Sequence, residues 1–349
     1  MEFQPIKTAL LSYGMSGEVF HGPLLKAHPG FEVTRVYHRS RSKKATHDFP
    51  VVHSVESIMK DESIELVIVN TPNDSHFSYA MEALRAKKHV VVEKPFTVTT
   101  AEADELIRFA DSQKCLLTGF QNRRWDGGFL TVQHILREKL LGRIVEFELH
   151  YDRYRNYIEA GTWKEKDERG TGILYNLGSH MLDQVLVLFG VPESVDARMG
   201  IQRTGGEVID YYDIRLLYDA MNVIVKSSYL VREPGPMYRI NGTEGSFVKN
   251  GMDPQEQALK EKKVPGGAGW GTEPKEWWGK INTSINGIHI DGLVETLPGN
   301  YLEFYNNLYG AIRLNKTLSV KATEARDVIS LIEAAVESNR TLSAVKIKR

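Results

Sequence analysis

Short apolar runs alternate with helix-like stretches along the first third of the chain. The apolar runs occupy residues 6–11, 31–37, 65–70, 90–92 and 116–119, and helices are expected over residues 18–27, 75–86 and 101–111. The run Leu66-Val67-Ile68-Val69 lacks polar alternation, as expected for a strand of a parallel sheet that has helices on both faces. The alternation predicts βαβ units with right-handed crossovers, and hence a doubly wound parallel sheet of the Rossmann type.

The pattern after residue 122 is typical of a second domain. Residues 144–154 alternate in polarity, with apolar side chains at 145, 147, 149 and 151, which is the period of a strand with one buried face. Further strands are expected over residues 193–203, 211–218, 222–231 and 238–241, and helices over 130–139, 301–314 and 323–338. The glycine- and tryptophan-rich stretch 249–287 is expected to be an elaborated loop.

These elements predict an α/β chain with two domains. Residues 1–122 would form a dinucleotide-binding domain, and residues 123–349 a substrate-binding and oligomerisation domain with an open, mainly antiparallel sheet. Tyr211, Leu216 and Tyr229 are expected on the free face of that sheet, and exposed apolar patches often mark interfaces. We therefore expect a homodimer or a larger homo-oligomer formed through the open sheet.

Composition excludes several classes of function. The 349 residues are 42% hydrophobic and 26% charged with a net charge of −1, so no overall field would attract nucleic acid or an anionic membrane. No apolar run approaches the roughly 20 residues needed to span a bilayer, and the N-terminus does not resemble a signal peptide. The single cysteine, Cys115, provides neither an intrachain disulfide nor a thiolate metal cage. The histidines form no H-x-x-x-H pair, so we expect no metal site, and we expect a cytoplasmic protein.

A glycine-containing turn follows the first predicted strand. It reads Ser12-Tyr13-Gly14-Met15-Ser16-Gly17, so Gly14 and Gly17 occupy the second and third glycine positions of the G-x-G-x-x-G fingerprint, and Ser12 replaces the first. The motif is imperfect, but its place between a strand and a helix start favours a phosphate-binding turn over an ordinary glycine turn. We expect Ser12, Gly14, Ser16 and Gly17 to hold a diphosphate at the helix N-terminus.

The end of the second strand indicates which dinucleotide binds. An NAD enzyme usually has Asp or Glu about 20 residues beyond the glycines, on the ribose 2′-hydroxyl. This chain has Tyr37-His38-Arg39-Ser40-Arg41-Ser42-Lys43-Lys44 at that place and no acid before Asp48. Arg39 and Ser40, with Arg41 as a further candidate, would bind a 2′-phosphate through charge-assisted hydrogen bonds. A solvated basic loop is the alternative, but the location favours NADP over NAD.

Three further motifs resemble those of a known family. The chain reads Thr71-Pro72-Asn73-Asp74-Ser75-His76, then Lys88-His89-Val90, then Glu93-Lys94-Pro95. In this order and spacing, the motifs resemble the glucose–fructose oxidoreductase and inositol dehydrogenase family of NAD(P)-dependent enzymes, from the first strand to about residue 315. The stretch from Tyr13 to His21 looks most similar to the NADP-linked scyllo-inositol dehydrogenase branch of that family.

The resemblance implies roles for these residues. Lys94 matches the family's catalytic lysine beside the nicotinamide, and Pro95 often follows a cis bond. A cation in a dry cleft would stabilise the negative charge that develops on oxygen when a hydroxyl becomes a ketone. Glu93 would position Lys94 or the cofactor, and His76 would either line the dinucleotide cleft or cap the following helix. The implied cofactor residues beyond the glycine turn and the basic strand end are Thr71, Pro72, Asn73, His76, Glu93, Lys94 and Asn122.

A second landmark lies at residues 170–183. The family pattern is G-G-x-L-x-D-x-G-x-H-x-x-D, and the resemblance implies that His180 is a general base, with a structural histidine as the alternative. Asn176 and His180 are four residues apart, so they share one helix face and can contact the same substrate. Asn176 stands where the family usually has aspartate, and an amide can orient a hydroxyl but cannot take its proton. We expect Lys94 and His180 to carry the chemistry and Asn176 to position the substrate.

Arg124 and Trp163 complete the candidate substrate residues. Arg124 lies in a stretch that faces substrate and nicotinamide in the family, with a salt bridge between the two domains as the alternative role. Trp163 would form an aromatic wall for a sugar, or else belong to the core. The resulting prediction is an NADP-dependent dehydrogenase or reductase that acts on a CH–OH group of a sugar or an inositol-like polyol. Two alternatives stay open, namely a glycoside hydrolase that retains its dinucleotide and a non-catalytic sensor of cofactor or sugar.

Overall fold

The chain folds into two compact units that do not follow a single cut in the sequence. The computed structural model describes residues 4–39 and 49–347. The first unit comprises residues 1–125, 254–270 and 300–326, and the second comprises residues 126–253, 271–299 and 327–349. Helix α9 (Ala322–Thr341) begins in the first unit and continues in the second. None of the helices in the described ranges is long and apolar enough to cross a membrane.

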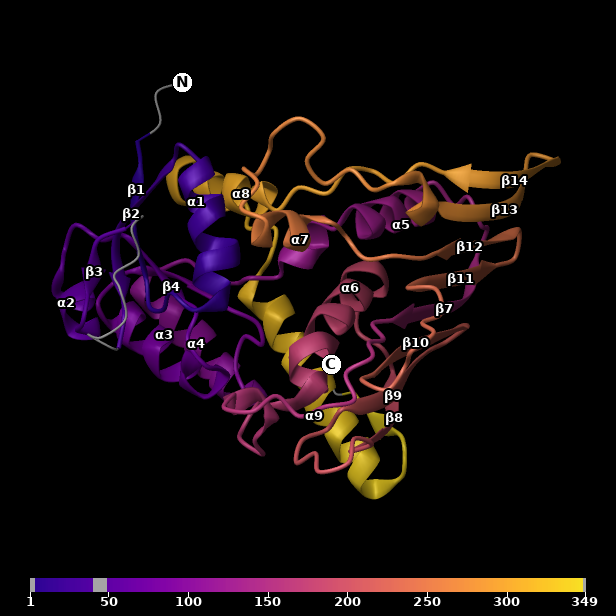
Figure 1. Cartoon of the computed structure of the whole chain (residues 1–349), viewed down its shortest axis with the longest axis horizontal. Helices are drawn as coiled ribbons and strands as arrows, with labels where there is room; N and C mark the ends of the chain where they lie inside the picture. Colours follow the sequence, from indigo (N-terminus) through magenta and orange to yellow (C-terminus); the bar gives the residue numbers. More distant parts are fainter. Residues whose placement is uncertain (1–3, 40–48, 348–349) are drawn as a thin grey trace. The chain divides into compact units, whose positions relative to one another are not determined.

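The first unit is built on a six-stranded parallel sheet (Figure 1). Its order is β3 (Val51–Val52), β2 (Phe31–Tyr37), β1 (Ile6–Leu10), β4 (Leu66–Val69), β5 (His89–Val92) and β6 (Leu117–Gly119). All four residues of β4 are buried, as expected for a central strand with both faces covered. The sheet confirms the Rossmann prediction. Because the order reverses between β2 and β4 on either side of β1, the carboxyl end of β1 is where such a fold binds ligands.

The helices of the first unit come from three separate stretches of sequence. They are α1 (Gly22–Ala27), α2 (Val55–Lys60), α3 (His76–Arg85), α4 (Thr100–Gln113), α7 (Gln255–Lys260) and α8 (Leu302–Leu314), and α2, α7 and β3 were not predicted. Helix α4 begins at a capping box, in which the Thr99 side chain accepts from the Glu102 amide and the Glu102 carboxylate accepts from the Thr99 amide. Phe304 and Tyr305 of α8 pack with Phe120 in the core that also contains β1 and β4. A late segment of the chain thus completes the core of the N-terminal sheet.

The second unit contains a nine-stranded sheet. Its order is β14 (Ile288–Val294), β13 (Gly279–Ile285), β12 (Gly245–Lys249), β11 (Tyr238–Gly242), β7 (Ile144–His150), β10 (Met221–Ser228), β9 (Tyr211–Tyr218), β8 (Ser194–Gly200) and β15 (Val345–Lys346). Strands β7 and β10 pair in parallel, and the other neighbours pair antiparallel. This confirms the mainly antiparallel sheet. Helices α5 (Gly127–Arg137) and α6 (Ser179–Phe189) also belong to this unit.

Two expectations about the second half of the chain are wrong. Residues 249–287 are not a loop throughout, since α7 and β13 lie within them. The apolar pattern of β13 is weak because its inward positions are Gly279, Ile281 and Thr283. Leu216 and Tyr229 are buried rather than exposed. The alternation of β9 directs Leu216 inward and leaves Leu217 outside, and Tyr229 lies just beyond the end of β10.

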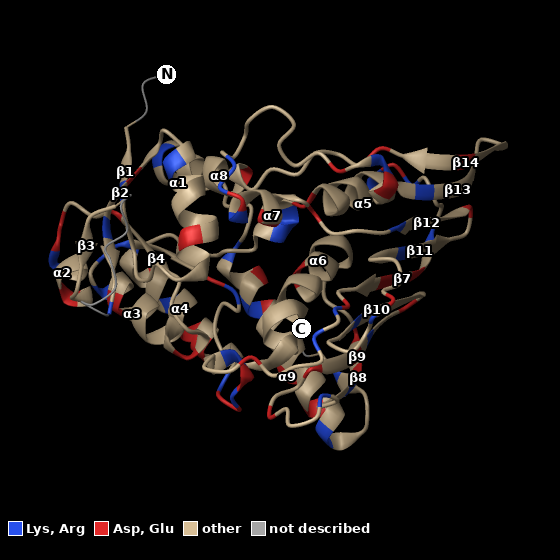
Figure 2. Cartoon of the chain, in the orientation of Figure 1, with Lys and Arg blue, Asp and Glu red and all other residues tan. Residues whose placement is uncertain are grey.

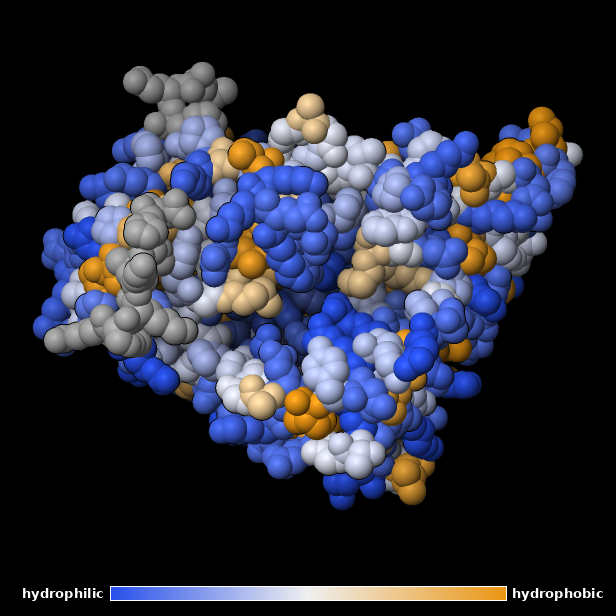
Figure 3. All heavy atoms as spheres, viewed as in Figure 1, coloured by the Kyte–Doolittle hydropathy of each residue, from blue (hydrophilic) through white to orange (hydrophobic). Residues whose placement is uncertain are grey.

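Exposed apolar side chains gather instead on the edge strand β14. Ile288 is 67% exposed and Leu293 is 55% exposed. Figure 3 shows hydrophobic residues over the end of the β13–β14 hairpin. Homo-oligomer formation through the sheet stays a prediction.

Candidate active site

The turn after β1 has the geometry of a phosphate-binding turn. Ser12, in the place of the first glycine, accepts the Gly14 amide on its Oγ at 3.2 Å. Its carbonyl accepts the Asn70 side-chain amide at 2.8 Å. A Cβ on Gly17 would lie 2.7 Å from the Ser12 carbonyl oxygen, so only glycine fits there without a backbone shift. The Oγ bond to the Gly14 amide is the contact that serine adds to this turn, since a glycine would keep the carbonyl bond and provide only conformational freedom.

A helix begins directly at this turn. The π-helical turn η1 (Gly17–His21) continues into α1, which has Pro23 in its first turn. The Glu18 amide donates to the Gly14 carbonyl at 2.9 Å. A helix N-terminus presents backbone N–H groups and a partial positive charge, which suit a diphosphate. π-turns inside helices also occur often at functional sites.

A cavity of about 1130 Å³ opens over this turn in the first unit. Five predicted cofactor residues line it: Ser12, Gly14, Arg39, Thr71 and Pro72. Arg39 follows β2, where the sequence places no acid, and Ser40 and Arg41 lie outside the described residues. The volume slightly exceeds the range of about 300–1,000 Å³ typical of small-ligand sites. The cavity therefore has the size, the helix start and the guanidinium that a phosphorylated dinucleotide requires.

Five residues of the cavity wall come from a distant part of the sequence that was not predicted to contribute to this site. They come from α7 and the turn after it: Leu259, Lys262, Lys263, Val264 and Pro265. Leu259 belongs to the buried core of the first unit. No local motif links this segment to the glycine turn, because the two are far apart in the sequence.

The loop after β5 carries Lys94. Lys94 is half-buried, and the Lys94–Pro95 peptide bond is cis, which confirms that expectation. Glu93 Oε2 accepts the Lys94 amide at 3.0 Å, and Glu93 Oε1 lies 3.0 Å from His21 Nε2. His21 Nδ1 in turn lies 2.6 Å from the Tyr305 hydroxyl. A chain of buried polar groups thus links α8 and η1 to the backbone of Lys94.

The charge of Glu93 is stabilised within this chain. Burial acts to raise the pKa of Glu93, but the hydrogen bond and charge of His21, together with the Lys94 charge and amide, lower that pKa overall. Glu93 is therefore an ionised acceptor, and it fixes the Lys94 backbone. A contact between Glu93 and the cofactor remains a prediction.

The remaining candidates of the first unit take up different positions. The His76 ring lies 2.8 Å from the Pro95 carbonyl and 2.9 Å from the Thr71 carbonyl, so His76 joins two loops that carry cofactor candidates. Asn73 begins the 3₁₀ turn η2 (Asn73–Ser75), and Asn122 is buried in η3 (Asn122–Trp125). Ser16 and Gly17 lie in the helix start and are not among the residues that line the cavity.

Arg124 takes part in an ion pair within the first unit. Its guanidinium donates to the Glu324 carboxylate at 2.8 Å and to the Ser319 carbonyl at 2.8 Å. The side chain is 9% exposed. Arg124 is therefore engaged in a salt bridge, but within one unit rather than between two domains as the alternative expected. Substrate contact by Arg124 remains a prediction.

The second landmark folds as a continuous helix in the second unit. Asn176 lies in the π-helical turn η5 (Leu174–Gly178), and His180 is the second residue of α6. Asn176 is partly exposed, whereas His180 is 6% exposed and Asp183 is 2% exposed. The predicted site residues are thus divided, with Lys94 in the first unit and Asn176 and His180 in the second.

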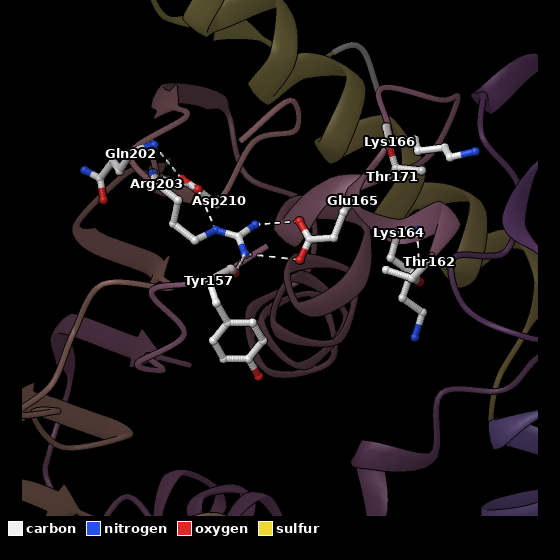
Figure 4. A network of polar contacts seen from close by, with 9 residues as sticks. All are labelled: Tyr157, Thr162, Lys164, Glu165, Lys166, Thr171, Gln202, Arg203 and Asp210. Atoms are coloured by element: carbon white, nitrogen blue, oxygen red, sulfur yellow. Dashed lines mark hydrogen bonds and ion pairs between the residues drawn. The ribbon is translucent and has the colours of Figure 1, made fainter. Parts of the chain in front are cut away.

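The buried side chain of Arg203 binds the segment of residues 157–165, which precedes this helix (Figure 4). Arg203 donates to the Glu165 carboxylate at 2.7 and 3.1 Å, to Asp210 Oδ2 at 2.9 Å and to the Tyr157 carbonyl at 2.7 Å. Trp163 and Glu165 share the 3₁₀ turn η4 (Trp163–Glu165). Arg203 therefore holds the strap of residues 157–165, which carries Trp163, against the connection between β8 and β9. No local motif in the sequence marks Arg203 for this role.

Metal ligands are not grouped in the described part of the chain, where no three His, Cys, Asp or Glu side chains are placed to hold an ion.

Comparisons with known proteins agree with this arrangement. Residues 6–120 match the family described as "Oxidoreductase family, NAD-binding Rossmann fold", and residues 134–347 match "Oxidoreductase family, C-terminal alpha/beta domain". The scyllo-inositol 2-dehydrogenase (NADP(+)) IolW of Bacillus subtilis is 41% identical over 98% of this chain and 96% of its own length.

Solved structures are similar over the whole chain. The Bacillus subtilis protein yvaA superposes with a TM-score of 0.94 at 38% identity, with full coverage of both chains. A Bacteroides fragilis protein superposes with a TM-score of 0.89 at 43% identity, covering 99% of this chain and 100% of its own. With both units matched, the chain belongs to the GFO/IDH/MocA oxidoreductase family, and its first unit is an NAD(P)-binding Rossmann domain.

Proposed function

We propose that this protein is an NADP-dependent oxidoreductase that acts on a CH–OH carbon of a sugar or an inositol-like cyclic polyol. The observation that carries the proposal is the cavity in which the glycine turn and Arg39 meet, with no acid at the end of β2. A carboxylate at that place would bind a ribose 2′-hydroxyl and repel a 2′-phosphate, whereas a guanidinium attracts the phosphate. The name of the relative IolW, scyllo-inositol 2-dehydrogenase (NADP(+)), is consistent with the same function.

Residues of the first unit bind the cofactor and stabilise the charge that develops on the substrate. When bound, NADP supplies the hydride acceptor or donor. The Gly14–Gly17 turn and the start of η1 hold the diphosphate through backbone N–H groups. Glu93 holds the Lys94 backbone, and the Lys94 ammonium stabilises the substrate oxygen as it gains negative charge.

His180 and Asn176 act on the substrate from one helix. His180 takes the hydroxyl proton as general base during oxidation and returns it during reduction. Asn176 donates or accepts a hydrogen bond to orient a neighbouring hydroxyl, because a carboxamide does not exchange protons at neutral pH. Trp163 offers an apolar face for the C–H side of the ring.

The test is a cofactor and substrate panel with the purified protein. We expect absorbance at the NADPH wavelength to rise with NADP and inositols or sugars, and to fall with NADPH and the corresponding ketones, with weaker activity for NAD. The variant Lys94→Met is expected to lose about 100-fold or more in kcat while NADPH affinity is retained. Lys60→Met, at an exposed lysine of the same unit, is the matched control.

The outcomes separate the competing functions. Substrate cleavage without net NADPH formation would instead indicate a hydrolase that retains its dinucleotide. NADPH binding without turnover across the whole panel would indicate a sensor. Equal turnover by Lys94→Met and the wild-type protein would overturn the assigned role of Lys94.

A further inference from the structure

A segment from the second half of the chain forms one wall of the dinucleotide cavity. Lys262 and Lys263 line the same cavity as Gly14 and Arg39. Both lysines lie on the turn that ends α7, and Figure 2 marks basic residues in blue around this helix. The segment belongs to the same compact unit as the Rossmann sheet, so the whole cavity lies within one unit.

The segment is anchored by a buried glutamine. Gln255 is fully buried, and its Oε1 accepts the Tyr301 amide at 2.7 Å and the Trp270 indole N–H at 3.0 Å. Its Nε2 donates to the Trp125 carbonyl at 3.1 Å. A buried amide with all of these partners is costly to displace. Gln255 therefore ties the start of α7 to three separate parts of the first unit.

Two further contacts fix the rest of the helix. Arg123, whose side chain is 7% exposed, forms an ion pair with Glu256 at 2.7 Å. Leu259, 3% exposed, packs in the core with Tyr301 and Phe304. Buried polar and apolar contacts thus hold α7 in place, and the two lysines follow directly after this helix.

The turn that carries the lysines is itself hydrogen-bonded. The Lys262 amide donates to the Leu259 carbonyl at 2.9 Å, and the Lys263 amide donates to the Ala258 carbonyl at 3.0 Å. Lys262 has a φ of +59°, and this pattern of bonds ends a helix by reversing the chain. The reversal brings Lys262, Lys263, Val264 and Pro265 to the cavity wall.

The charges on the cavity wall favour an anion. Four basic side chains line it, Lys26, Arg39, Lys262 and Lys263, against the two acids Glu18 and Asp74. Lys263 also pairs with Glu261 at 2.9 Å, but both side chains are well exposed, so that pair is weak. The diphosphate already has the helix start as its binding site, which leaves Arg39 and the α7 lysines for a further phosphate.

We propose that Lys262 and Lys263 act with Arg39 as the binding site for the 2′-phosphate of NADP, so that the turn after α7 helps to select NADP over NAD. The inference rests on the proposed use of NADP. A phosphate monoester carries about −1.5 to −2 charges at neutral pH, more than one guanidinium neutralises. The α7 turn adds two point charges to the positive charge at the end of β2.

The test is direct cofactor binding by the full chain, measured as Kd for NADPH and for NADH through nicotinamide fluorescence. We expect Lys262→Gln and Lys263→Gln each to weaken NADPH binding by about 10-fold at low salt, and NADH binding by less than about 3-fold. Lys260→Gln, at an exposed lysine of α7 that does not line the cavity, is the matched control and should change neither Kd. The NADPH effect should shrink in high salt because the charges are screened.

A second measurement does not depend on affinity. Acetylation of the protein by a lysine reagent, followed by mass spectrometry, should show Lys262 and Lys263 protected by NADPH more strongly than by saturating NADH, with Lys260 protected by neither. Thermal unfolding of each variant checks that the fold is retained.

The outcomes distinguish the inference from the proposed function. If the wild-type protein prefers NADPH and the lysine variants bind NADPH equally tightly, the inference is overturned and the proposed function stands. Equal weakening of NADPH and NADH binding would also overturn it, because the lysines would then contact a part shared by both cofactors. A wild-type protein that binds NADH in preference to NADPH, or neither, would overturn both proposals.

Discussion

Replacement of Arg203 by methionine should destabilise the protein through the charge it leaves behind. The Arg203 side chain is 1% exposed and the Asp210 side chain is 0% exposed. Methionine fills much of the same volume but supplies no charge and no donors. The Asp210 carboxylate would then lie buried without a counter-ion, and removal of one partner of such a pair typically costs about 3–5 kcal/mol.

The structure places the expected loss in the lower part of that range. Asp210 keeps two backbone donors, the Gln202 amide at 2.7 Å and the Arg203 amide at 3.0 Å, and these partly stabilise its charge. The second partner, Glu165, has a side chain that is 15% exposed and can turn toward solvent. We therefore expect a loss of about 3 kcal/mol in the free energy of unfolding.

Equilibrium unfolding in urea, followed by circular dichroism, measures this loss. The matched control is Arg198→Met, because Arg198 pairs with Asp196 at 2.9 Å but both side chains are well exposed, and exposed pairs contribute about 0–1 kcal/mol. The double variant Arg203→Met/Asp210→Asn should recover part of the stability, since the buried charge is removed.

Limited proteolysis provides a local readout of the same change. Without Arg203, the strap of residues 157–165 loses its bonds at the Tyr157 carbonyl and at Glu165, and should be cleaved faster in native buffer. A loss in Arg203→Met no larger than that in Arg198→Met, or no recovery in the double variant, would refute the argument from an uncompensated buried charge.

Three further changes test other parts of the structure. Gly17→Ala places a Cβ 2.7 Å from the Ser12 carbonyl oxygen and should weaken NADPH binding by about 10-fold or more and lower the melting temperature. The Cβ of Gly14→Ala has only an ordinary contact with the protein at 3.5 Å, so this variant should weaken binding without lowering the melting temperature. The same loss of stability in both variants would contradict the steric argument. Asn176→Asp should retain or raise turnover in the substrate assay if Lys94 and His180 suffice for the chemistry, and a complete loss of turnover would show that the amide is required. Burial lowers the pKa of His89, so the unfolded chain binds the proton more readily than the folded chain. The contribution of His89 to stability is therefore present above the unfolded pKa of about 6.5 and is lost as pH falls below it. His89→Gln should reduce the difference between the urea midpoints at pH 7.5 and 5.5, and an unchanged difference would exclude His89 as a source of the pH dependence of stability.

Local patterns in the sequence predicted five of the six strands of the Rossmann sheet, whereas β3, α2 and α7 were missed. The unalternated run at β4 predicted a strand covered on both faces, and Gly14 and Gly17 predicted the turn at the end of β1, because each depends on neighbours within a few residues. The phase of the strand alternation at residues 211–218 was harder to read. Apolar side chains lie at both 216 and 217, and only packing decided that Leu216 faces inward.

The sequence by itself determined most strands of the parallel sheet and the position of the glycine turn, since periodic burial and backbone sterics act over short distances. The tertiary structure alone decided which distant segments share a unit. It placed Lys262 and Lys263, from the turn after α7, at the wall of the cavity over the glycine turn, and it joined His21 and Tyr305 to Glu93, next to Lys94. Such partners are selected by the packing and hydrogen-bond satisfaction of buried groups, and no short stretch of sequence encodes that information.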